Sequence, residues 1–422
     1  MSKLAKYPLP VILFTIFIDL LGFGILIPVI PLLLADPRSP YYLLPSGFTV
    51  SQGYILLGFL TAIFPFMQFL AAPILGQLSD KFGRKPILAF SLMGTCLSYI
   101  IFAIGIITKN ISILFLARAF DGITGGNLSV AQASIADVST PENRAKNFGL
   151  IGAVFGLGFI IGPYIGGKFS DPSIVSWFSA ATPFWFAAIL SFTNVLSVIF
   201  MFPETHKRID KNVKIFWNKS IHNIVRAYTY GKLRVIFTTV FLFAAGFSFF
   251  VTFFAVFLIN KFGFHQGNIG DYFAFVGIWI AITQAVVTRF LAKRLKPDQI
   301  VRFSIIGTGA TMLLYFLPNV WWELLFIVPF FAIFNGLSQA NITALVSNSV
   351  DNSIQGEILG INTSIQALAQ AIPPALSGFI AANLTAEAPV IVAAVVIIIS
   401  GLTFFFFYKP VHIETVSISE PA

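Results

Sequence analysis

The sequence contains little charge and a single cysteine. Only 10% of its 422 residues are charged, whereas 57% are hydrophobic, and the mean hydropathy is +0.87. This composition excludes an ordinary soluble globular protein and predicts a helical protein that crosses a membrane several times. The lone Cys96 excludes an internal disulfide and any metal site built from clustered cysteines. We therefore expect neither a metal nor another cofactor.

Groups that could perform catalysis are also scarce in the apolar segments. The four histidines all fall in predicted loops or in the C-terminal tail: His206, His222, His265 and His412. The run Gly162-x4-Gly167-Lys168 imitates a phosphate-binding loop, but Phe169 stands where that loop requires serine or threonine. Because no nucleophile–base set or metal cluster is present, we expect no enzyme and no nucleotide site.

Basic residues outnumber acidic ones, which gives a net charge of +9. With a cytoplasmic N-terminus, 21 of the 26 lysines and arginines fall on the cytoplasmic side and four fall outside. This asymmetry follows the positive-inside rule, so it predicts that both termini are cytoplasmic and argues against a nucleic-acid partner. The first apolar run, Val11–Leu34, exceeds a signal-peptide core, and we expect it to remain as the first helix in a bacterial inner membrane.

Hydrophobic runs divide the chain into twelve predicted membrane spans and one long polar linker. The spans cover residues 10–34, 52–75, 86–107, 111–136, 146–168, 181–202, 235–259, 268–291, 300–318, 321–347, 357–382 and 388–408. The linker, 203–234, carries eight lysines and arginines. It contains either a short helix on the inner membrane surface or a disordered basic segment. We predict an all-α membrane protein of two six-helix bundles, 1–202 and 235–410, with a cytoplasmic tail at 411–422.

The two halves resemble each other in sequence. A shift of 211 residues places Gly125 over Gly336, Pro163 over Pro374 and Gly167 over Gly378 without a gap. Transporters built from such repeats bind substrate near the midplane, between the halves.

A short charged stretch separates the second and third predicted spans: Gly76-Gln77-Leu78-Ser79-Asp80-Lys81-Phe82-Gly83-Arg84-Lys85. Its four charges keep it out of hydrocarbon, and its two glycines permit a tight turn. The run resembles the loop between helices 2 and 3 of the major facilitator superfamily, G-x-L-x-D-[RK]-x-G-[RK]-[RK], at every defined position. This resemblance implies the twelve-helix major facilitator fold. The alternative is that the charges only set the topology.

In that superfamily the loop acts as a conformational latch, which implies roles for several residues here. We expect Asp80 to face the start of helix 11 near Gly356, because a carboxylate favours the positive end of a helix dipole. We expect Arg84 to pair with Asp137 at the inner end of helix 4. These contacts should hold while the cavity opens outward and break when it opens inward. The expected latch comprises Gly76, Asp80, Lys81, Gly83, Arg84, Lys85, Asp137 and Arg144.

The fifth predicted span is rich in glycines at intervals of four residues, which place them on one helical face and let a neighbouring backbone approach closely. A proline in the same run invites a bend. The pattern resembles the helix 5 motif of drug:proton antiporters, and plain helix packing is the alternative. The motif residues are Gly158, Gly162, Pro163, Gly166 and Gly167.

Ionisable residues occur inside two predicted spans. Asp19 lies roughly 14 Å from the inner end of the first span, at about 1.5 Å per residue, and Asp121 lies at a similar depth in the fourth. Arg118 and Asp121 are three residues apart and so share a helical face. Such groups are costly in a membrane and mark functional pathways. We expect Asp19 and Asp121 to exchange protons, with Arg118 as the counter-ion. In the alternative, Arg118 and Asp121 neutralise each other and Asp19 alone titrates.

The segment 114–167 resembles tetracycline-efflux proteins in particular. The matching runs include Gly122-Ile123-Thr124-Gly125, Ile135-Ala136-Asp137 and Pro203-Glu204-Thr205-His206-Lys207. Two departures matter, because tetracycline exporters have acidic residues in helices 3 and 9. Helix 3 here offers only Ser98 and Tyr99, and helix 9 has no acid. A tetracycline–metal chelate is therefore not the expected substrate.

Amide side chains take the place of acids in the second half. Unpaired amides are costly in lipid, so they should line the central cavity or bond to a neighbouring helix. The expected cavity residues are Gln284, Asn335, Gln339, Asn362 and Gln366. With 49 phenylalanines in the chain, we expect an aromatic cavity that suits an amphipathic organic compound.

These observations predict a monomeric, proton-coupled transporter that works by alternating access and exports a hydrophobic or amphipathic organic compound. The runner-up is import or export of an endogenous metabolite or siderophore by the same machinery. A receptor that uses the fold without transport would not need charges in mid-membrane.

Overall fold

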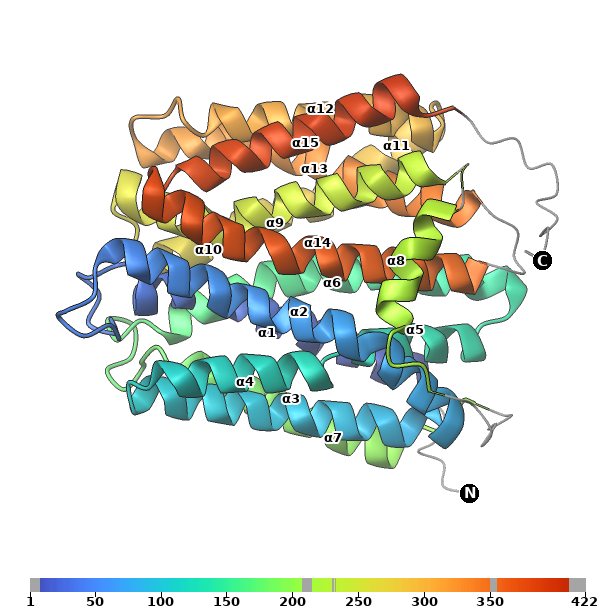
Figure 1. Ribbon diagram of the computed structural model, residues 1–422, viewed down its shortest axis with the longest axis horizontal. Helices are drawn as coiled ribbons and strands as arrows, with labels where there is room; N and C mark the ends of the chain where they lie inside the picture. Colours follow the sequence, from blue (N-terminus) through green and yellow to red (C-terminus); the bar gives the residue numbers. More distant parts are fainter. Residues whose placement is uncertain (1–7, 207–214, 230, 232, 350–354, 410–422) are drawn as a thin grey trace.

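The computed structural model describes residues 8–206, 215–229, 231, 233–349 and 355–409. Within these ranges the regular structure is entirely helical, and most of the long helices run side by side in one bundle (Figure 1). We call the end of the bundle where α1 begins the termini end, and the opposite end the far end. The amphipathic helix α8 lies at the termini end, across the other helices.

The described residues of the first half, 8–202, form seven helices. Their bounds are α1 Pro8–Leu34, α2 Val50–Phe82, α3 Arg84–Ile107, α4 Ile111–Thr124, α5 Asn127–Val138, α6 Pro141–Phe169 and α7 Thr182–Met201.

The linker and the second half follow. Their elements are α8 Lys219–Thr229, α9 Arg234–Phe262, α10 Gln266–Ile282, the π-helix η1 Thr283–Val287, α11 Thr288–Ala292, α12 Pro297–Leu314, the 3₁₀ turn η2 Trp321–Glu323, α13 Leu324–Asn348, α14 Gln355–Asn383 and α15 Ala388–Phe407.

Each of the twelve predicted spans coincides with helical structure, but only ten described segments are long and apolar enough by themselves to cross a membrane. The predicted span 111–136 is not one of them, because Gly125 and Gly126 divide it into α4 and α5. The predicted span 300–318 is α12, which begins with the polar run Pro297-Asp298-Gln299. The linker prediction of a short helix corresponds to α8.

The break between α4 and α5 is stabilised by α2. Gln68 of α2 donates a hydrogen bond from Nε2 to the carbonyl of Gly125, at 2.8 Å. A Cβ at Gly126 would lie 2.8 Å from Cα of Ala72, so only glycine allows α2 to approach this closely. The break therefore keeps its backbone satisfied and redirects α5.

A second irregularity interrupts the helix formed by α10 and α11. Residues 283–287 form a π-helix, in which the N–H of Thr288 donates to the carbonyl of Thr283. Single π turns inside α-helices cost stability and are frequent at functional sites. Gln284, one of the predicted cavity residues, lies in this turn.

Glycines bring the two halves of the chain into contact near the far end. Gly58 of α2 packs on Gly378 of α14, and Gly167 of α6 packs on Gly270 of α10. All four lie close to the far end of their helices. The ion pair Lys168–Asp271, at 2.8 Å, joins α6 and α10 beside the second contact. The structure thus has its far end closed.

Candidate functional site

Asp19 lies on α1 against the start of α5. Its Oδ1 accepts a hydrogen bond from Nδ2 of Asn127, at 3.2 Å, and its Oδ2 is shielded without a described hydrogen-bond partner. Asn127 is the first residue of α5, so the break after α4 positions its side chain toward α1. A carboxylate that is removed from water and has one free oxygen is chemically suited to hold a proton. The sequence did not predict a functional role for Asn127. The only signal was its position directly after Gly125 and Gly126.

Arg118 and Asp121 form a buried ion pair within α4. Their Nη1 and Oδ2 atoms lie 3.1 Å apart, and each residue is 5% exposed. The guanidinium also stacks over the ring of Phe64, with 4.4 Å to the centroid, while Nε has no described hydrogen-bond partner. A buried charge costs several kcal/mol unless it is paired, so neither partner could be removed without exposing the other to that cost.

Tyr99 of α3 connects the two acidic sites. A Cβ placed on Gly22 of α1 would overlap the Tyr99 hydroxyl, so that hydroxyl lies directly against α1. The same side chain is close enough to Asp19, Asp121 and Arg118 to interact with them electrostatically. Tyr99, Arg118 and Asp121 also line a small cavity of about 10 Å³. The sequence placed Tyr99 in the correct span but without a role.

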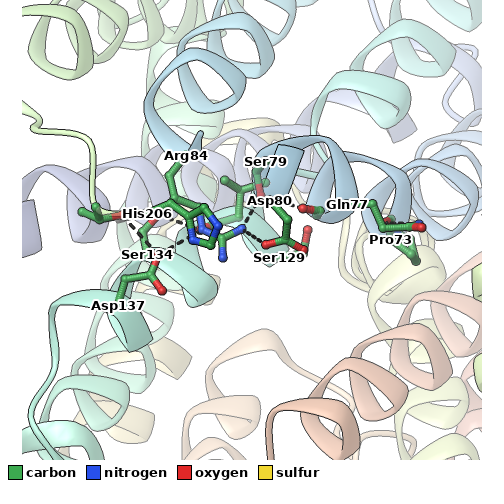
Figure 2. A network of polar contacts seen from close by, with 12 residues as sticks. Pro73, Gln77, Ser79, Asp80, Arg84, Ser129, Ser134, Asp137 and His206 are labelled. Atoms are coloured by element: carbon green, nitrogen blue, oxygen red, sulfur yellow. Dashed lines mark hydrogen bonds and ion pairs between the residues drawn. The ribbon is translucent and has the colours of Figure 1, made fainter. Parts of the chain in front are cut away.

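The charged turn between α2 and α3 builds a polar network at the termini end (Figure 2). Arg84 is 6% exposed and pairs with two carboxylates, Asp80 of α2 at 2.7 Å and Asp137 of α5 at 3.0 Å. Its Nη1 also donates to the hydroxyl of Ser79. Figure 2 shows the Arg84 side chain between Asp80 and Asp137. The structure therefore brings these three predicted latch residues together around one guanidinium.

Glu204, which follows α7, completes this network and was not predicted to take part. Its two carboxylate oxygens accept hydrogen bonds from the backbone N–H groups of Arg84, at 2.9 Å, and Lys85, at 3.1 Å. These are the first two residues of α3, so a negative charge caps the positive end of that helix. Gly83 makes room for it, because a Cβ there would contact the carboxylate and because its φ is 101°. The only sequence signal for this role was the acidic residue in the run Pro203-Glu204-Thr205.

The remaining predicted latch residues are placed as follows. Gly76 faces the hydroxyl of Ser129, and Nζ of Lys81 lies 5.8 Å from the ring of Phe82. The expected contact of Asp80 with the start of helix 11 near Gly356 falls outside the described side chains, as does the side chain of Arg144. Among the described residues, Asp80 pairs with Arg84, one helical turn away.

The glycines of the helix 5 motif serve two different contacts. Gly158, Gly162 and Gly166 pack on the backbone or Cβ atoms of α1 between Leu20 and Ile25. Gly167 packs instead on α10, and Pro163 lies inside α6, where its ring approaches Gly24. The motif therefore fixes α6 against α1 and also supplies one of the glycine contacts between the two halves.

The five predicted cavity amides differ in their surroundings. Asn335 is 3% exposed and Asn362 is 7% exposed, and the Oδ1 atom of each lacks a described hydrogen-bond partner. Gln284 is half-buried and points toward Gly152 of α6. Gln339 is exposed and Gln366 is half-buried. Asn335 and Asn362 are thus the two buried amides of the five, and each has a shielded oxygen without a described hydrogen-bond partner.

Asn335 lines an aromatic cavity in the second half of the chain. The cavity has a volume of about 10 Å³, room for about one water, and its other walls come mainly from α9, α10 and α13. The rings of Phe250, Tyr315 and Phe331 lie 5.1 to 6.1 Å apart along one side. The sequence predicted aromatic side chains and Asn335 for a cavity, but not which phenylalanines would form it.

The chain is similar to a known family and to several known proteins. A family model described as Major Facilitator Superfamily matches residues 12–372 and, again, residues 236–421. The tetracycline resistance protein of class H from Pasteurella multocida is 33% identical over 344 residues, which are 81% of this chain and 80% of that protein. The class C protein from Escherichia coli is 35% identical over 73% of this chain and 72% of its own length. Multidrug resistance protein 2 of Bacillus subtilis is 28% identical over 72% and 70%.

Solved structures share the fold at lower sequence identity. The human organic anion transporter MFSD10 (TETRAN) aligns with a TM-score of 0.72 and 21% identity, and the alignment covers 96% of this chain and 100% of that one. A D-xylose-proton symporter aligns with a TM-score of 0.74 and 14% identity, over 96% and 97%.

Proposed function

Because the chain belongs to the major facilitator superfamily, a family of multi-pass membrane transporters, we propose that it exports a hydrophobic or amphipathic organic compound in exchange for protons. Relatives named for tetracycline resistance and for multidrug resistance support proton-coupled drug efflux. The chain performs transport rather than catalysis. The observation that carries the proposal is a shielded carboxylate, Asp19, in mid-helix beside a second acidic site.

In the proposed mechanism, Asp19 takes up a proton from one side of the membrane and releases it to the other. Asn127 donates to one oxygen of the carboxylate and leaves Oδ2 for the proton. Protonation removes a charge from the contact between α1 and α5. Since a buried charge is costly, the change in protonation alters which arrangement of the halves is favoured.

The experiment uses purified protein in liposomes under an imposed pH gradient, with drugs, siderophores and metabolites offered in turn. Substrate-driven proton movement should be lost in Asp19→Asn and should persist in Asp298→Asn, an acid at the start of α12. Undiminished coupling in both Asp19→Asn and Asp121→Asn would sink the proposal. Loss in Asp19→Asn alone would support the alternative in which Arg118 and Asp121 only neutralise each other.

The latch is proposed to control the step of the transport cycle in which the termini end closes. Arg84 holds Asp80 and Asp137 together although the far end is closed. The expectation that the pair of Arg84 and Asp137 forms only while the cavity opens outward is therefore not met in this structure, since both residues belong to the first half and need no closure between the halves to meet. We propose that, when the termini end closes, Asp80 caps the start of α14 near Gly356. Asp80→Asn should then favour the conformation open at the termini end, whereas normal transport by this variant would mean that the charges only set topology.

The termini end is proposed to be cytoplasmic, since the basic residues of α8 and of the turn after α2 lie there. We also propose that the protein is a monomer in a bacterial inner membrane, with one six-helix bundle on each side of the 203–234 linker. The second candidate function, transport of an endogenous metabolite or siderophore, is favoured by the lack of acids at the positions that tetracycline exporters use in helices 3 and 9.

A further inference from the structure

The amphipathic helix α8 connects the two halves of the molecule from outside. It contacts α2 of the first half and both α14 and α9 of the second (Figure 1). Near its beginning, Ser220 donates a hydrogen bond from Oγ to the carbonyl of Phe69 on α2. One turn later, Asn223 donates from Nδ2 to the hydroxyl of Ser364 on α14, at 3.1 Å. A single short helix thus crosses the seam, the line along which α2 and α14 meet.

Further hydrogen bonds fasten both ends of α8. Before the helix, the side chain of Gln77 on α2 accepts from the backbone N–H of Phe216, at 2.8 Å, and donates to its carbonyl, at 3.3 Å. After the helix, Arg234, the first residue of α9, donates to the carbonyl of Tyr228, at 3.1 Å. The beginning of α8 is therefore held by the first half, and its end by the second.

The sides of α8 differ in chemistry and, at about 100° per residue, are centred roughly 120° apart. The side toward the bundle comprises Ser220, Asn223, Ile224 and Ala227, the apolar side Ile221, Val225 and Tyr228, and the basic side Lys219, His222 and Arg226. The apolar and basic sides are exposed, and the described residues 215–229 include no acid. A helix that covered only protein would need one inward side, so the exposed apolar side indicates contact with a second apolar phase.

The bilayer is the apolar phase at the level of α8. α2 has 33 residues and is about 50 Å long, so it extends beyond a hydrocarbon layer of about 30 Å, and it ends in the charged turn. Ser220 bonds to Phe69, about 20 Å before α2 ends at Phe82, which is close to the edge of that layer. Phe66 and Leu70, beside Phe69 on α2, are 46% and 37% exposed. The apolar side of α8 therefore continues a surface of α2 that faces lipid.

The aromatic and basic side chains of this segment suit lipid headgroups. Trp217 is 75% exposed and Tyr228 is 48% exposed, and these two residue types concentrate at membrane interfaces. Lys219 and Arg226 add positive charge on the exposed basic side. Each lysine or arginine near a membrane surface strengthens the attraction to anionic lipid by roughly fivefold. Charge complementarity thus favours an anionic phospholipid over a neutral one.

We propose that α8 is a strap that binds anionic phospholipids of the leaflet at the termini end and thereby stabilises the state with a closed far end. The lipids fix the outer sides of α8, and Ser220 and Asn223 pass this constraint to α2 and α14. When the termini end closes, α2 and α14 move relative to each other, so at least one of these hydrogen bonds breaks. A ligand that binds one state better shifts the population toward that state. This role is independent of the compound that the protein carries.

Lipid binding is measured by the quenching of Trp217 as the only tryptophan, with the other five replaced by phenylalanine, in the full chain in phosphatidylcholine nanodiscs. Brominated phosphatidylglycerol should quench severalfold more than brominated phosphatidylcholine at the same small mole fraction. Lys219→Gln with Arg226→Gln should remove most of this difference. Arg289→Gln with Lys293→Gln, at exposed positions of the same end, should keep it.

Two results would overturn lipid binding by α8. Equal quenching by both brominated lipids would show that the strap does not select anionic lipid. Absence of quenching by either lipid would show that α8 faces water or is covered by protein, such as a second copy of the chain.

The effect on conformation is measured by distances between spin labels at residues 47 and 319, both exposed at the far end. Phosphatidylglycerol should increase the population with a closed far end by a fewfold. Asn223→Ala loses the bond to α14 but keeps the outer sides, so it should keep the quenching of Trp217 and lose the response of the distances. Asn218→Ala, at an exposed position before α8, should keep both. A full response in Asn223→Ala, or no response in the unmodified protein, would overturn the strap.

Neither measurement requires a substrate, so the outcomes are separate from those of the proposed function. Lipid-dependent distances together with no proton movement for any compound would support the strap and count against antiport. Substrate-driven proton movement together with distances that ignore phosphatidylglycerol would support antiport and overturn the strap.

Discussion

Glu204 shows how much one side chain contributes to the turn between α2 and α3. Among the described residues, its carboxylate alone accepts hydrogen bonds from the first two N–H groups of α3. Gly83 leaves the space that this carboxylate occupies. A cap of this type stabilises a helix by roughly 0.5–2 kcal/mol. It also holds the segment after α7 against the network of Arg84.

We predict that Glu204→Ala lowers the free energy of unfolding by about 1 kcal/mol and lowers the thermal unfolding midpoint in detergent. Glu387→Ala is the matched control, because Glu387 also precedes a helix but makes no side-chain cap. Equal midpoints for the two variants would show that the cap contributes nothing.

Gln68 has a comparable role at the break between α4 and α5. If it is replaced by leucine, the carbonyl of Gly125 loses its hydrogen bond in a part of the structure where water is scarce. We predict that Gln68→Leu costs about 1–3 kcal/mol of stability, measured by thermal unfolding. Gln370→Leu, at an exposed position of α14, serves as the control and should change the midpoint little. The prediction fails if Gln68→Leu unfolds at the same temperature as this control.

At the scale of elements, α6 depends on the spacing of its glycines. A Cβ at Gly162 would lie 2.8 Å from both Cα of Gly24 and the carbonyl oxygen of Leu21, and backbone atoms cannot yield as a flexible side chain can. The contact therefore constrains how α1 and α6 pack. On α1 it involves Gly24, five residues after Asp19, whose carboxylate accepts from Asn127 of α5.

We predict that Gly162→Ala destabilises the protein by about 1–3 kcal/mol and reduces transport severalfold, because the added methyl separates α1 from α6. The same substitution at Gly156, six residues earlier in α6, meets nothing within 4 Å. Gly156→Ala should be neutral or stabilise the helix by up to about 1 kcal/mol. Thermal unfolding measures the stability of both variants, and uptake into liposomes measures their transport. Equal stability and equal transport of the two variants would contradict the packing argument.

At the scale of the whole molecule, the far end is held closed by glycine contacts and by the ion pair between Lys168 and Asp271. The pair is partly exposed, with side-chain exposures of 25% and 52%, so its contribution is modest. Because it joins α6 to α10, however, its loss acts on the balance between conformations rather than on folding alone.

We predict that Lys168→Met increases the population with an open far end by a fewfold, and that the double reversal Lys168→Asp with Asp271→Lys restores the original population. Distances between spin labels at residues 47 and 319, both exposed at the far end, measure this. Lys109→Met, at an exposed site of the same end within the first half, is the control. If the charge-reversed double variant does not restore the distances, the effect of Lys168→Met comes from altered packing and not from the lost ion pair.

The sequence by itself determined the elements and their chemistry. Long apolar runs can satisfy their backbone only as helices in a membrane, so every predicted span coincides with helical structure. The charged turn could only lie at an aqueous end, and its resemblance to the major facilitator loop implied the pair of Arg84 and Asp137, which lie 3.0 Å apart. Glycines four apart predicted the close approach of α6 to a neighbour.

Only the tertiary structure decided which distant residues meet. Asn127 and Asp19 are 108 positions apart, and Glu204 reaches Arg84 over 120. The aromatic cavity takes its walls from several helices, and local periodicity cannot distinguish a phenylalanine facing lipid from one facing a cavity, because both surroundings are apolar. Helix formation is a local property of the chain, whereas the partner of a buried polar group depends on how the helices pack.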